Sequence, residues 1–520
     1  MNNPLVPPLF DVQPVTVSDI LISRAATDSD RVVFAEGEAR LTYRQLLEEA
    51  RTLAAGLFDA GLRAGDRAAL SMAAGLDFVR AFWALQLLGV TSCALNPYVP
   101  APTSVRRAAR VRPAMLITDS AEVAREASSA AMRSLVFRDI PRVQRAVPAF
   151  PADVESIAIL QPTSGTSGES RTAMIRHRNV IACLASAVEA LRFGPHDVFV
   201  AWVPPWHDLG LIRFVVGTVY YGGRTHIVQP AIQTIPEWFQ TMSRERATVT
   251  GAPDFAWRLA SRFVDPHSVD LTSLRDATNG GEPVRRSTVE LFEETFGIQS
   301  AMLPGYGLAE VTLGATCLLP GERQRVDAHG NVSCGRALPD VELRIDGEHG
   351  QPGEILLRGP LVFAGYFDAE EATREVLRDG WLHTGDVGQL DSDGHLYVLG
   401  RKRAMLKRGG AVLAPRELEE AAQQIEGVKI AAAVGLSSET ATEGIVVVIE
   451  TGERDDGSRI AAEVAQSIRA TLGFAPERVV VLKKGTIPRT YNGKLRHDAL
   501  RIALADGTFE RAGAIVASSA

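Results

Sequence analysis

The chain alternates between helical and extended patterns of apolar residues through most of its length. Residues 42–61 place leucines and alanines at helical spacing and end at Gly61, which predicts an amphipathic helix. The short apolar run at 67–71 predicts a strand, and residues 81–95 predict a buried helix that leads into another strand. Because strands that alternate with helices usually pair in parallel, we expect parallel sheets covered by helices.

The pattern changes after Asp340. From there to Leu399, short strands are interrupted by Gly and Asp pairs, which predicts a small barrel-like β layer. A helix and two strands follow within residues 415–450. We therefore predict an α/β fold with two domains: a large N-terminal domain of mixed α/β sheets that includes the β layer (residues 1–402), and a small α+β C-terminal domain (residues 403–520).

The composition indicates a globular protein and excludes several classes. Of the 520 residues, 46% are hydrophobic and 22% are charged, a balance that is atypical of disordered chains. The formal net charge of −7 argues against a basic nucleic-acid-binding surface over the whole chain. The four cysteines are scattered without the spacing of a zinc site or a disulfide framework, so we expect buried thiols in a reducing compartment.

The N-terminal segment carries no sign of export. It has no basic region followed by a long apolar run, and the most apolar stretch, residues 81–95, is too short to span a bilayer. We expect a cytoplasmic protein without a membrane span or a nucleic-acid partner, and a homodimer is one option for its assembly.

The strongest local signal is a loop rich in glycine and hydroxyl groups. Six small residues in succession, Thr163 to Gly168, follow an apolar strand at 158–162. Backbone N–H groups of such a loop can surround a phosphate, and its hydroxyls add donors. The lysine of a Walker A loop is missing, and a flexible surface turn is the alternative interpretation.

Residues 164–172, SGTSGESRT, resemble the first half of the phosphate loop of the adenylate-forming (ANL) superfamily, which contains acyl-CoA synthetases, fatty acyl-AMP ligases, luciferases and peptide-synthetase adenylation domains. The second half departs from that pattern, with Ser170, Arg171 and Thr172 in place of proline, lysine and glycine. An arginine can still pair with phosphate. The resemblance implies that the ATP phosphates contact Thr163, Ser164, Gly165, Thr166, Ser167, Gly168 and Arg171, and that Thr166 also lies at the metal.

Five further motifs follow in the family's order. Residues 202–212, WVPPWHDLGLI, resemble the wall of the family's carboxylate pocket, which implies that Trp206 and His207 face the acid. Residues 278–284, TNGGEPV, resemble the loop that lines one face of adenine. That resemblance implies nucleotide contacts for Gly281, Glu282 and Pro283.

Residues 304–310, PGYGLAE, resemble the family's YGxTE motif. The resemblance implies that Tyr306 stacks on adenine and that Glu310 helps to hold Mg²⁺, because a hard cation that bridges phosphates needs carboxylate oxygen. It also places Gly307, Leu308 and Ala309 beside the nucleotide, with Ala309 replacing the usual threonine.

Residues 381–388, WLHTGDVG, resemble the family's TGD motif, which implies that Asp386 accepts hydrogen bonds from both ribose hydroxyls. Residues 396–410 match the next motif in register. By that match, Arg401 assists at the ribose, Arg403 is the hinge between the domains, and the thiol tunnel is lined by Lys407 and Gly410.

Residues 488–496, PRTYNGKLR, resemble PRTxxGKxxR, which implies that Lys494 bridges the acid carboxylate and the α-phosphate during adenylation. The chain has only six lysines, none before residue 402, and we attribute this scarcity to a coding bias toward arginine. A lysine at position 494 therefore supports the role that the resemblance implies. The argument is weaker because Lys483 and Lys484 are also lysines in the same part of the chain.

The resemblance implies an AMP-forming acid–thiol ligase. ATP, Mg²⁺ and a carboxylic acid would give an acyl-adenylate, the C-terminal domain would rotate as a mobile lid, and a thiol would displace AMP, with His207, Glu310 and Lys494 as catalytic residues. Residues 310–353 are too few for the insertion of fatty acyl-AMP ligases, so we favour CoA over an acyl carrier protein as acceptor. The alternatives are a half-reaction enzyme and a degenerate protein that only binds nucleotide or acyl-adenylate.

The identity of the acid is the least specified property. Gly251 and Gly280 are small where the acyl group would enter, and Trp257 would join Trp206 in the wall. A carboxylate from Asp208 or Asp254 facing the pocket would favour an amino acid, and its absence an apolar acid. We favour a bulky or lipid-like apolar acid.

Overall fold

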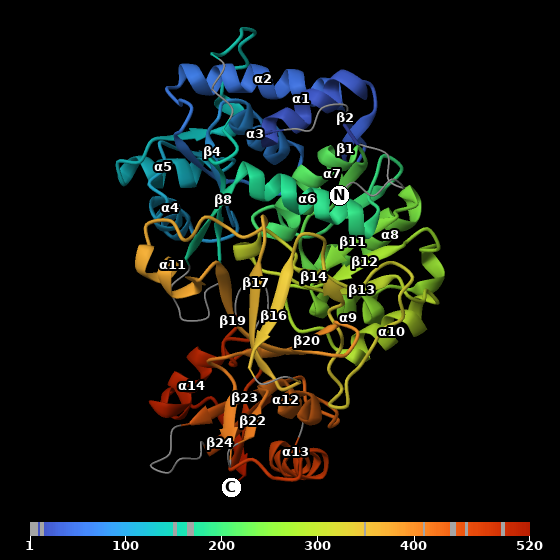
Figure 1. The fold of residues 1–520 in the computed structure, drawn as a ribbon. Helices are drawn as coiled ribbons and strands as arrows, with labels where there is room; N and C mark the ends of the chain where they lie inside the picture. Colours follow the sequence, from blue (N-terminus) through green and yellow to red (C-terminus); the bar gives the residue numbers. More distant parts are fainter. Residues whose placement is uncertain are drawn as a thin grey trace.

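The computed structural model describes residues 9–10, 15–148, 153–163, 171–347, 350–408, 411–436, 444–452, 456–489 and 495–519. The predicted α/β architecture is confirmed (Figure 1): two helix-covered sheets form the upper part, a β layer lies below them, and the C-terminal segment packs beneath that layer.

The two sheets are parallel in their centres. The first has six strands, with only its edge strand β8 antiparallel, in the order β6 (Ser134–Val136), β5 (Met115–Thr118), β3 (Arg67–Ser71), β4 (Thr91–Leu95), β7 (Ile157–Pro162) and β8 (Thr172–Arg176). The second has nine strands, in the order β15 (Arg336–Ala337), β14 (Thr316–Cys317), β13 (Met302–Tyr306), β12 (Asp276–Asn279), β11 (Val249–Ala252), β9 (Val198–Ala201), β10 (Arg224–Ile227), β1 (Val32–Glu36) and β2 (Ala39–Thr42).

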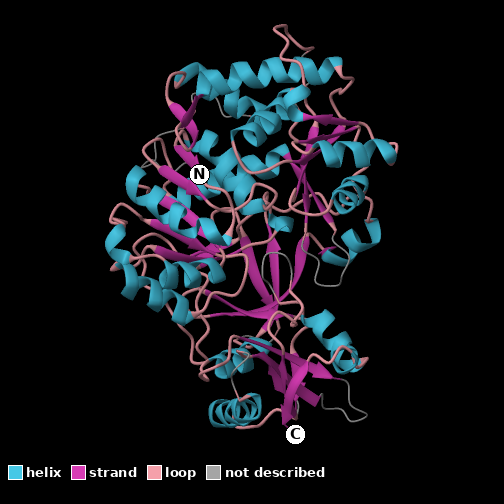
Figure 2. Cartoon of the chain, turned by 180° about the vertical axis from the view of Figure 1, so that it is seen from behind, coloured by secondary structure: helices cyan, strands magenta, loops and turns pink. Residues whose placement is uncertain are grey.

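Helices pack on the faces of both sheets (Figure 2): α1 (Val17–Thr27), α2 (Tyr43–Asp59), α3 (Leu76–Leu87), α4 (Ala101–Ala109), α5 (Ala121–Ser129), α6 (His177–Leu191), α7 (Thr218–Tyr221), α8 (Ile235–Glu245), α9 (Asp254–Phe263) and α10 (Arg286–Phe296). The helix predicted at 42–61 is α2, and it begins with a capping box. Thr42 Oγ1 accepts a hydrogen bond from Gln45 N at 3.2 Å, and Gln45 Oε1 accepts one from Thr42 N at 2.9 Å, so two N–H groups at the helix start are satisfied.

The β layer and the C-terminal segment are separate sheets. The layer is antiparallel and contains β16 (Glu342–Asp346), β17 (Gly353–Arg358), β18 (Leu377–Arg378), β19 (Trp381–Leu390) and β20 (Leu396–Arg401), with helix α11 (Glu370–Val376) beside it. The C-terminal segment contains the pair β21 (Leu406–Arg408) and β22 (Ala411–Leu413), the sheet β23 (Ile430–Leu436), β24 (Gly444–Glu450), β25 (Arg478–Leu482) and β26 (Ile515–Ser519), and helices α12 (Pro415–Gln423), α13 (Gly457–Leu472), α14 (His497–Ala505) and α15 (Thr508–Arg511).

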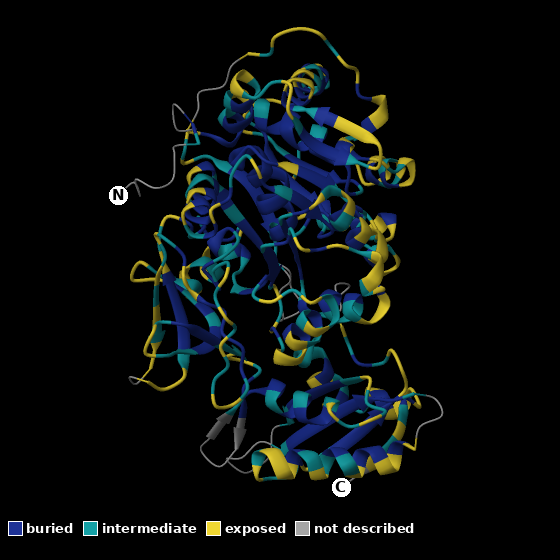
Figure 3. Cartoon of the chain, turned by 90° about the vertical axis from the view of Figure 1, so that its right-hand side faces the viewer, coloured by how far each residue is buried: buried dark blue, intermediate teal, exposed yellow. Residues whose placement is uncertain are grey.

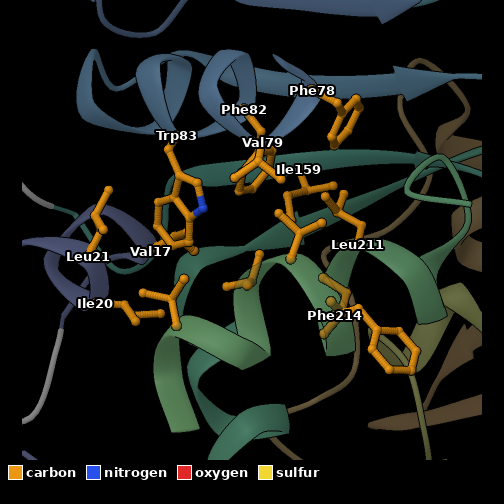
Figure 4. Close-up of a cluster of buried hydrophobic side chains, with 14 of the residues drawn as sticks. Val17, Ile20, Leu21, Phe78, Val79, Phe82, Trp83, Ile159, Leu211 and Phe214 are labelled. Carbon is orange, nitrogen blue, oxygen red and sulfur yellow. The ribbon is translucent and has the colours of Figure 1, made fainter. Parts of the chain in front are cut away.

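One apolar core joins the upper sheets. Figure 4 shows Val17 of α1 beside Trp83 of α3, and Ile20 and Phe82 belong to the same cluster. The same core includes Leu211 and Phe214 of a π-helical segment, η2 (Leu209–Gly217). Burial at both ends of the molecule is visible in Figure 3, where the C-terminal sheet has its own buried interior.

One contact between the C-terminal segment and the larger part is made by a buried arginine. Arg416 at the start of α12 donates a hydrogen bond from Nη2 to the carbonyl of Val284 at 2.5 Å, and its Nε donates to Glu420 at 2.6 Å. Val284 ends the 278–284 motif, so this motif and α12 are physically joined.

The four cysteines are buried free thiols. Within the described ranges, no helix is both long enough and apolar enough to cross a membrane.

We predict that Gly335→Ala strongly destabilises the fold. Gly335 has φ +74°, and an added Cβ would lie 1.9 Å from the carbonyl carbon of Cys317, which pairs with the next residue of β15. Backbone strain and the clash together should lower the free energy of unfolding by about 3 kcal/mol or more. Gly473→Ala is the matched control, because Gly473 has φ +78° with no atom within 4 Å of the added Cβ, and should cost only about 1 kcal/mol. Equal losses of thermal stability in the two variants would contradict this packing argument.

Candidate active site

Several predicted site residues lie together at the seam between the nine-stranded sheet and the β layer. Tyr306 is the last residue of β13, and Gly280 follows the last residue of β12. Asp386 and Arg401 face them as a cross-strand pair of β19 and β20. Ligands of open α/β sheets bind beyond the carboxyl ends of the parallel strands, and this seam is such a position.

Asp386 uses both carboxylate oxygens in this seam. Its Oδ2 accepts a hydrogen bond from the Tyr306 hydroxyl at 2.7 Å, and its Oδ1 lies 3.0 Å from Arg401 Nε. Burial first, and then the Asp386 carboxylate, raises the pKa of Tyr306 well above its usual range, so the phenol remains a hydrogen-bond donor. Burial opposes the charge on Arg401, but the Asp386 carboxylate acts together with Tyr306, Glu310 and Tyr366 to raise the pKa of Arg401.

A second carboxylate holds the turn that carries Asp386. Glu354, which is buried, accepts a hydrogen bond from Gly385 N at 3.0 Å and pairs with Lys402 Nζ at 2.9 Å. Lys402 N in turn donates to the carbonyl of Gly385 at 2.8 Å. These bonds tie β17, β19 and the end of β20 together and set the position of Asp386.

Glu310 lies next to this group, after β13. Its Oε1 accepts a hydrogen bond from the Tyr366 hydroxyl at 2.6 Å. Burial raises the pKa of Glu310, although the bond from Tyr366 and the charge of Arg401 act against that rise. The Arg171 guanidinium lies 5.2 Å from the centre of the Tyr366 ring, so the end of the 164–172 motif reaches the same neighbourhood.

Trp206 and His207 lie just before the segment Leu209–Gly217. His207 Nδ1 lies 2.6 Å from Asp208 Oδ1, which holds the orientation of the imidazole. Trp206 is buried, its carbonyl accepts a hydrogen bond from Gln161 Nε2 at 3.0 Å, and Tyr98 packs edge-on against its ring. A Cβ added to Gly281 would lie 3.9 Å from His207 Cε1, so the 202–212 and 278–284 motifs are neighbours.

The small residues of these motifs allow close approaches of the backbone. An added Cβ at Gly280 would lie 3.1 Å from the Gly305 carbonyl oxygen, and one at Gly307 would lie 1.9 Å from that of Leu313. Leu308 is half-buried, and Ala309 is buried in the core beneath the β layer. Gly251 is buried on β11, opposite Thr278 of β12.

Two residues of the 278–284 motif have surroundings that the sequence does not indicate. Glu282 Oε1 accepts a hydrogen bond from Phe255 N at 2.6 Å, at the start of α9, and Pro283 is exposed. The Glu282 side chain therefore contributes to the start of a helix.

The structure describes only part of the predicted phosphate loop. Ser164 to Ser170 lie outside the described residues, and these include Ser164, Gly165, Thr166, Ser167 and Gly168. The residues that flank them are held together, because Thr163 N and Oγ1 donate to the Arg171 carbonyl at 2.8 and 3.1 Å. The loop thus connects two paired antiparallel strands, β7 and β8, and no helix follows it directly.

Among the predicted hinge and tail residues, the structure describes the side chain of Arg403 alone. Arg403 is exposed and lines a pocket of about 480 Å³ with residues of β23 and α14. Lys407 is in β21, but its side chain is not described, and Gly410 and Lys494 lie outside the described residues.

The three other candidates for the acyl pocket have structural roles. Trp257 is fully buried against Trp238 and Phe292 in the helical core, so its predicted place in the pocket wall is wrong. Asp254 is buried and accepts hydrogen bonds from Arg285 N and the Thr288 hydroxyl, both at 3.0 Å.

Asp208 accepts a hydrogen bond from Leu209 N at 2.7 Å in addition to its contact with His207. Both aspartates are therefore bonded to neighbouring protein groups.

Sequence analysis missed Gln161, Tyr366 and Arg213. Gln161 is the second-last residue of the apolar strand before the loop, and its position near the motif could have marked it. Tyr366 lies in a glycine-containing stretch without a recognised pattern, and Arg213 continues the WVPPWHDLGLI motif by one residue. Only contacts across the fold reveal that Tyr366 bonds Glu310 and that Arg213 bonds Thr278.

Known proteins share this arrangement over almost the whole chain. A ligase of Mycobacterium tuberculosis is 30% identical, over 88% of this chain and 93% of that protein. The medium-chain-fatty-acid–[acyl-carrier-protein] ligase JamA of Moorena producens is 27% identical, over 95% and 96% of the two chains. The long-chain-fatty-acid–CoA ligase of Yersinia pestis is 28% identical, over 91% and 92%.

The fold is similar to that of a solved fatty acyl-adenylate ligase from work on the E. coli and L. pneumophila enzymes. The TM-score is 0.85 at 27% identity, and the match covers 97% of this chain and 99% of that one. A family model described as AMP-binding enzyme matches residues 21–367, well over half of the sequence. The chain therefore belongs to the AMP-binding enzymes, the adenylate-forming (ANL) superfamily.

Proposed function

We propose that this adenylate-forming ligase converts an acid to its acyl-adenylate at the seam described above and then transfers the acyl group to the thiol of CoA. The observation that supports this most directly is the Tyr306–Asp386–Arg401 group, in which a buried carboxylate is held between a phenol and a guanidinium where two sheets meet. Carboxylate oxygens can each accept more than one hydrogen bond, so Asp386 can take both hydroxyls of a ribose beside its protein partners.

The nucleotide would lie along the same seam. Tyr306 offers a ring face for adenine, and the glycines of the 278–284 motif allow the base to approach the backbone closely. Arg401 stays charged next to Asp386, so it can assist at the ribose while the phosphates extend toward Arg171. The phosphates of ATP would then approach the loop between β7 and β8.

The side chains present fit a magnesium ion that is shared with ATP. Glu310 provides carboxylate oxygen, held in place by Tyr366, on the path between Asp386 and Arg171. The described residues contain no group of three or more potential metal ligands, so Glu310 would contribute one oxygen beside those of the phosphates and water. The ion, when bound, would neutralise charge on the phosphates.

The acid carboxylate would bind beside His207. Asp208 Oδ1 lies 2.6 Å from His207 Nδ1 and orients the imidazole. The 278–284 motif comes next to the same imidazole at Gly281, so the acid and the nucleotide would meet there. A carboxylate oxygen attacks the α-phosphorus, the bond to pyrophosphate breaks, and Lys494 would offset the negative charge that develops. AMP is then a better leaving group than the original carboxylate oxygen when the thiol attacks the carbonyl.

CoA is the acceptor that we favour, and an acyl carrier protein is the second candidate. Relatives of nearly equal similarity carry either acceptor in their names, a CoA ligase at 28% identity and an acyl-carrier-protein ligase at 27%. The stretch between Glu310 and β17 is occupied by three short strands, β14, β15 and β16, which supports the view that it contains no extra domain.

We predict that Asp386→Asn weakens ATP binding about tenfold to a hundredfold, because one charged acceptor is replaced by an amide. Isothermal titration with a non-hydrolysable ATP analogue measures this loss. Asp393→Asn is the matched control, since Asp393 lies in the turn between β19 and β20 with 58% of its side chain exposed, and should keep the wild-type affinity. Equal affinities in the two variants would refute the role of Asp386.

Lys494→Ala should abolish acid-dependent ATP–pyrophosphate exchange while leaving the conversion of supplied acyl-AMP and CoA largely intact. The reason is that only the first step requires a cation at the α-phosphate. Lys484→Ala, on an exposed residue of the same segment, is the control and should leave both reactions unchanged. Exchange near the wild-type rate in Lys494→Ala would disprove the assigned role.

The acceptor can be determined by single-turnover discharge of the acyl-adenylate. We expect CoA to release AMP at least about tenfold faster than an equal concentration of a phosphopantetheinyl carrier protein, because CoA needs no docking surface for a protein. Faster release with the carrier protein would establish the second candidate, and acyl-adenylate that neither thiol discharges would identify a half-reaction enzyme.

A further inference from the structure

A buried arginine lies directly beyond the wall of the acid-binding region. Arg213 belongs to η2, the segment that begins two residues after His207. Extended π-helical segments are rare and are often found at functional sites. Leu211 and Phe214 anchor η2 in the apolar core (Figure 4), and the Arg213 side chain is only 8% exposed.

Arg213 forms a polar group with two residues of β12. Its Nη1 donates a hydrogen bond to the Thr278 hydroxyl and lies 3.6 Å from Asp276 Oδ2. The Thr278 hydroxyl donates to Asp276 Oδ1 at 2.6 Å. Phe193 closes one side, with its ring centre 5.3 Å from the guanidinium. A cation and an anion are thus enclosed together, away from bulk water.

Two atoms of this group have unused hydrogen-bonding capacity. Arg213 Nε and Asp276 Oδ2 are buried, and neither has a hydrogen-bond partner among the described residues. Buried donors and acceptors are nearly always paired in folded proteins, because an unpaired one costs free energy. One is a donor and the other an acceptor, and both belong to residues that already contact each other.

The register of the strands places this group below the acid-binding region. Thr278 and Asp276 are two residues apart on β12, so their side chains lie on the same face. Gly251 of β11 is opposite Thr278, and a Cβ added there would lie 3.4 Å from Thr278 Cβ and 3.7 Å from Leu209 Cδ2. Gly280, beside the carboxylate region, is two residues or about 7 Å further along the strand. Because Gly251 has no side chain, none stands between Thr278 and Leu209 at this position.

We propose that Arg213, Thr278 and Asp276 form the distal end of the acid pocket and that they bind a hydroxyl group at the far end of an otherwise apolar acid. This inference rests on the proposed function. A hydroxyl can accept from Arg213 Nε and donate to Asp276 Oδ2, which pairs both free atoms. A terminal methyl can do neither, and a second carboxylate would face the charge of Asp276.

The test compares acids that differ only at the far end. ATP–pyrophosphate exchange is measured with straight-chain acids of increasing length, each as a methyl-terminated and a hydroxyl-terminated form. At the length that reaches Arg213, wild-type enzyme should prefer the hydroxyl acid about tenfold to a hundredfold in kcat/KM. Arg213→Met should reduce this ratio to about one, mainly by loss of activity with the hydroxyl acid.

Control variants separate recognition from folding. Arg138→Met removes an arginine whose side chain is 76% exposed, and should leave the preference unchanged. Thr278→Val keeps Arg213 but removes the hydroxyl that holds it, and should reduce the preference even if Arg213→Met does not fold.

ATP–pyrophosphate exchange that is equally rapid with the methyl-terminated and hydroxyl-terminated acid of every length would overturn the proposal. That result would indicate that water pairs the two buried atoms, and it would leave the adenylating function intact. Absence of exchange with every acid would instead overturn the proposed function itself.

Discussion

Burial of charge at the seam between the nine-stranded sheet and the β layer determines how the site is built. A carboxylate out of water is strongly destabilised unless cations and hydrogen-bond donors compensate it. Asp386 obtains this compensation from Tyr306 on one sheet and Arg401 on the other. The hydrogen bond from Tyr306 to Asp386 therefore links the two sheets at the proposed site, and removing one partner of Asp386 leaves its charge less compensated.

The need to compensate buried charge also explains why several hydrogen bonds and ion pairs surround Asp386 and Glu310. Glu354 ties Lys402 and the turn at Gly385 together, and Tyr366 holds Glu310. None of these supporting groups has to touch a ligand to matter, because each limits the directions in which a neighbouring carboxylate can point. A site that is already organised needs less reordering when its ligand binds.

The sequence allowed much of the fold to be predicted, because local signals agreed with the tertiary structure. The apolar periodicity and the stop at Gly61 predicted α2, and the Gly and Asp pairs after Asp340 predicted the β layer. The family was identifiable because its motifs consist of consecutive residues. Their order is visible in the sequence without any knowledge of contacts.

Prediction failed where distance in the sequence hides proximity in space. Trp257 was expected in a pocket wall, but it packs in the helical core. Tyr366 could not be assigned, since its partner Glu310 lies 56 residues away. The same applies to Arg213 and Thr278, which are brought together only when η2 packs against β12.

The contact between Arg416 and Val284 has an energetic consequence for the C-terminal segment. A hydrogen bond from a buried guanidinium to a carbonyl contributes about 1.5–3 kcal/mol. An orientation of α12 that lacks this bond and forms no equivalent one is higher in free energy by that amount. Its population would then be roughly one to ten per cent. The carbonyl of Val284 is thus one main-chain acceptor that favours the docked orientation, and no side-chain substitution at that position removes it.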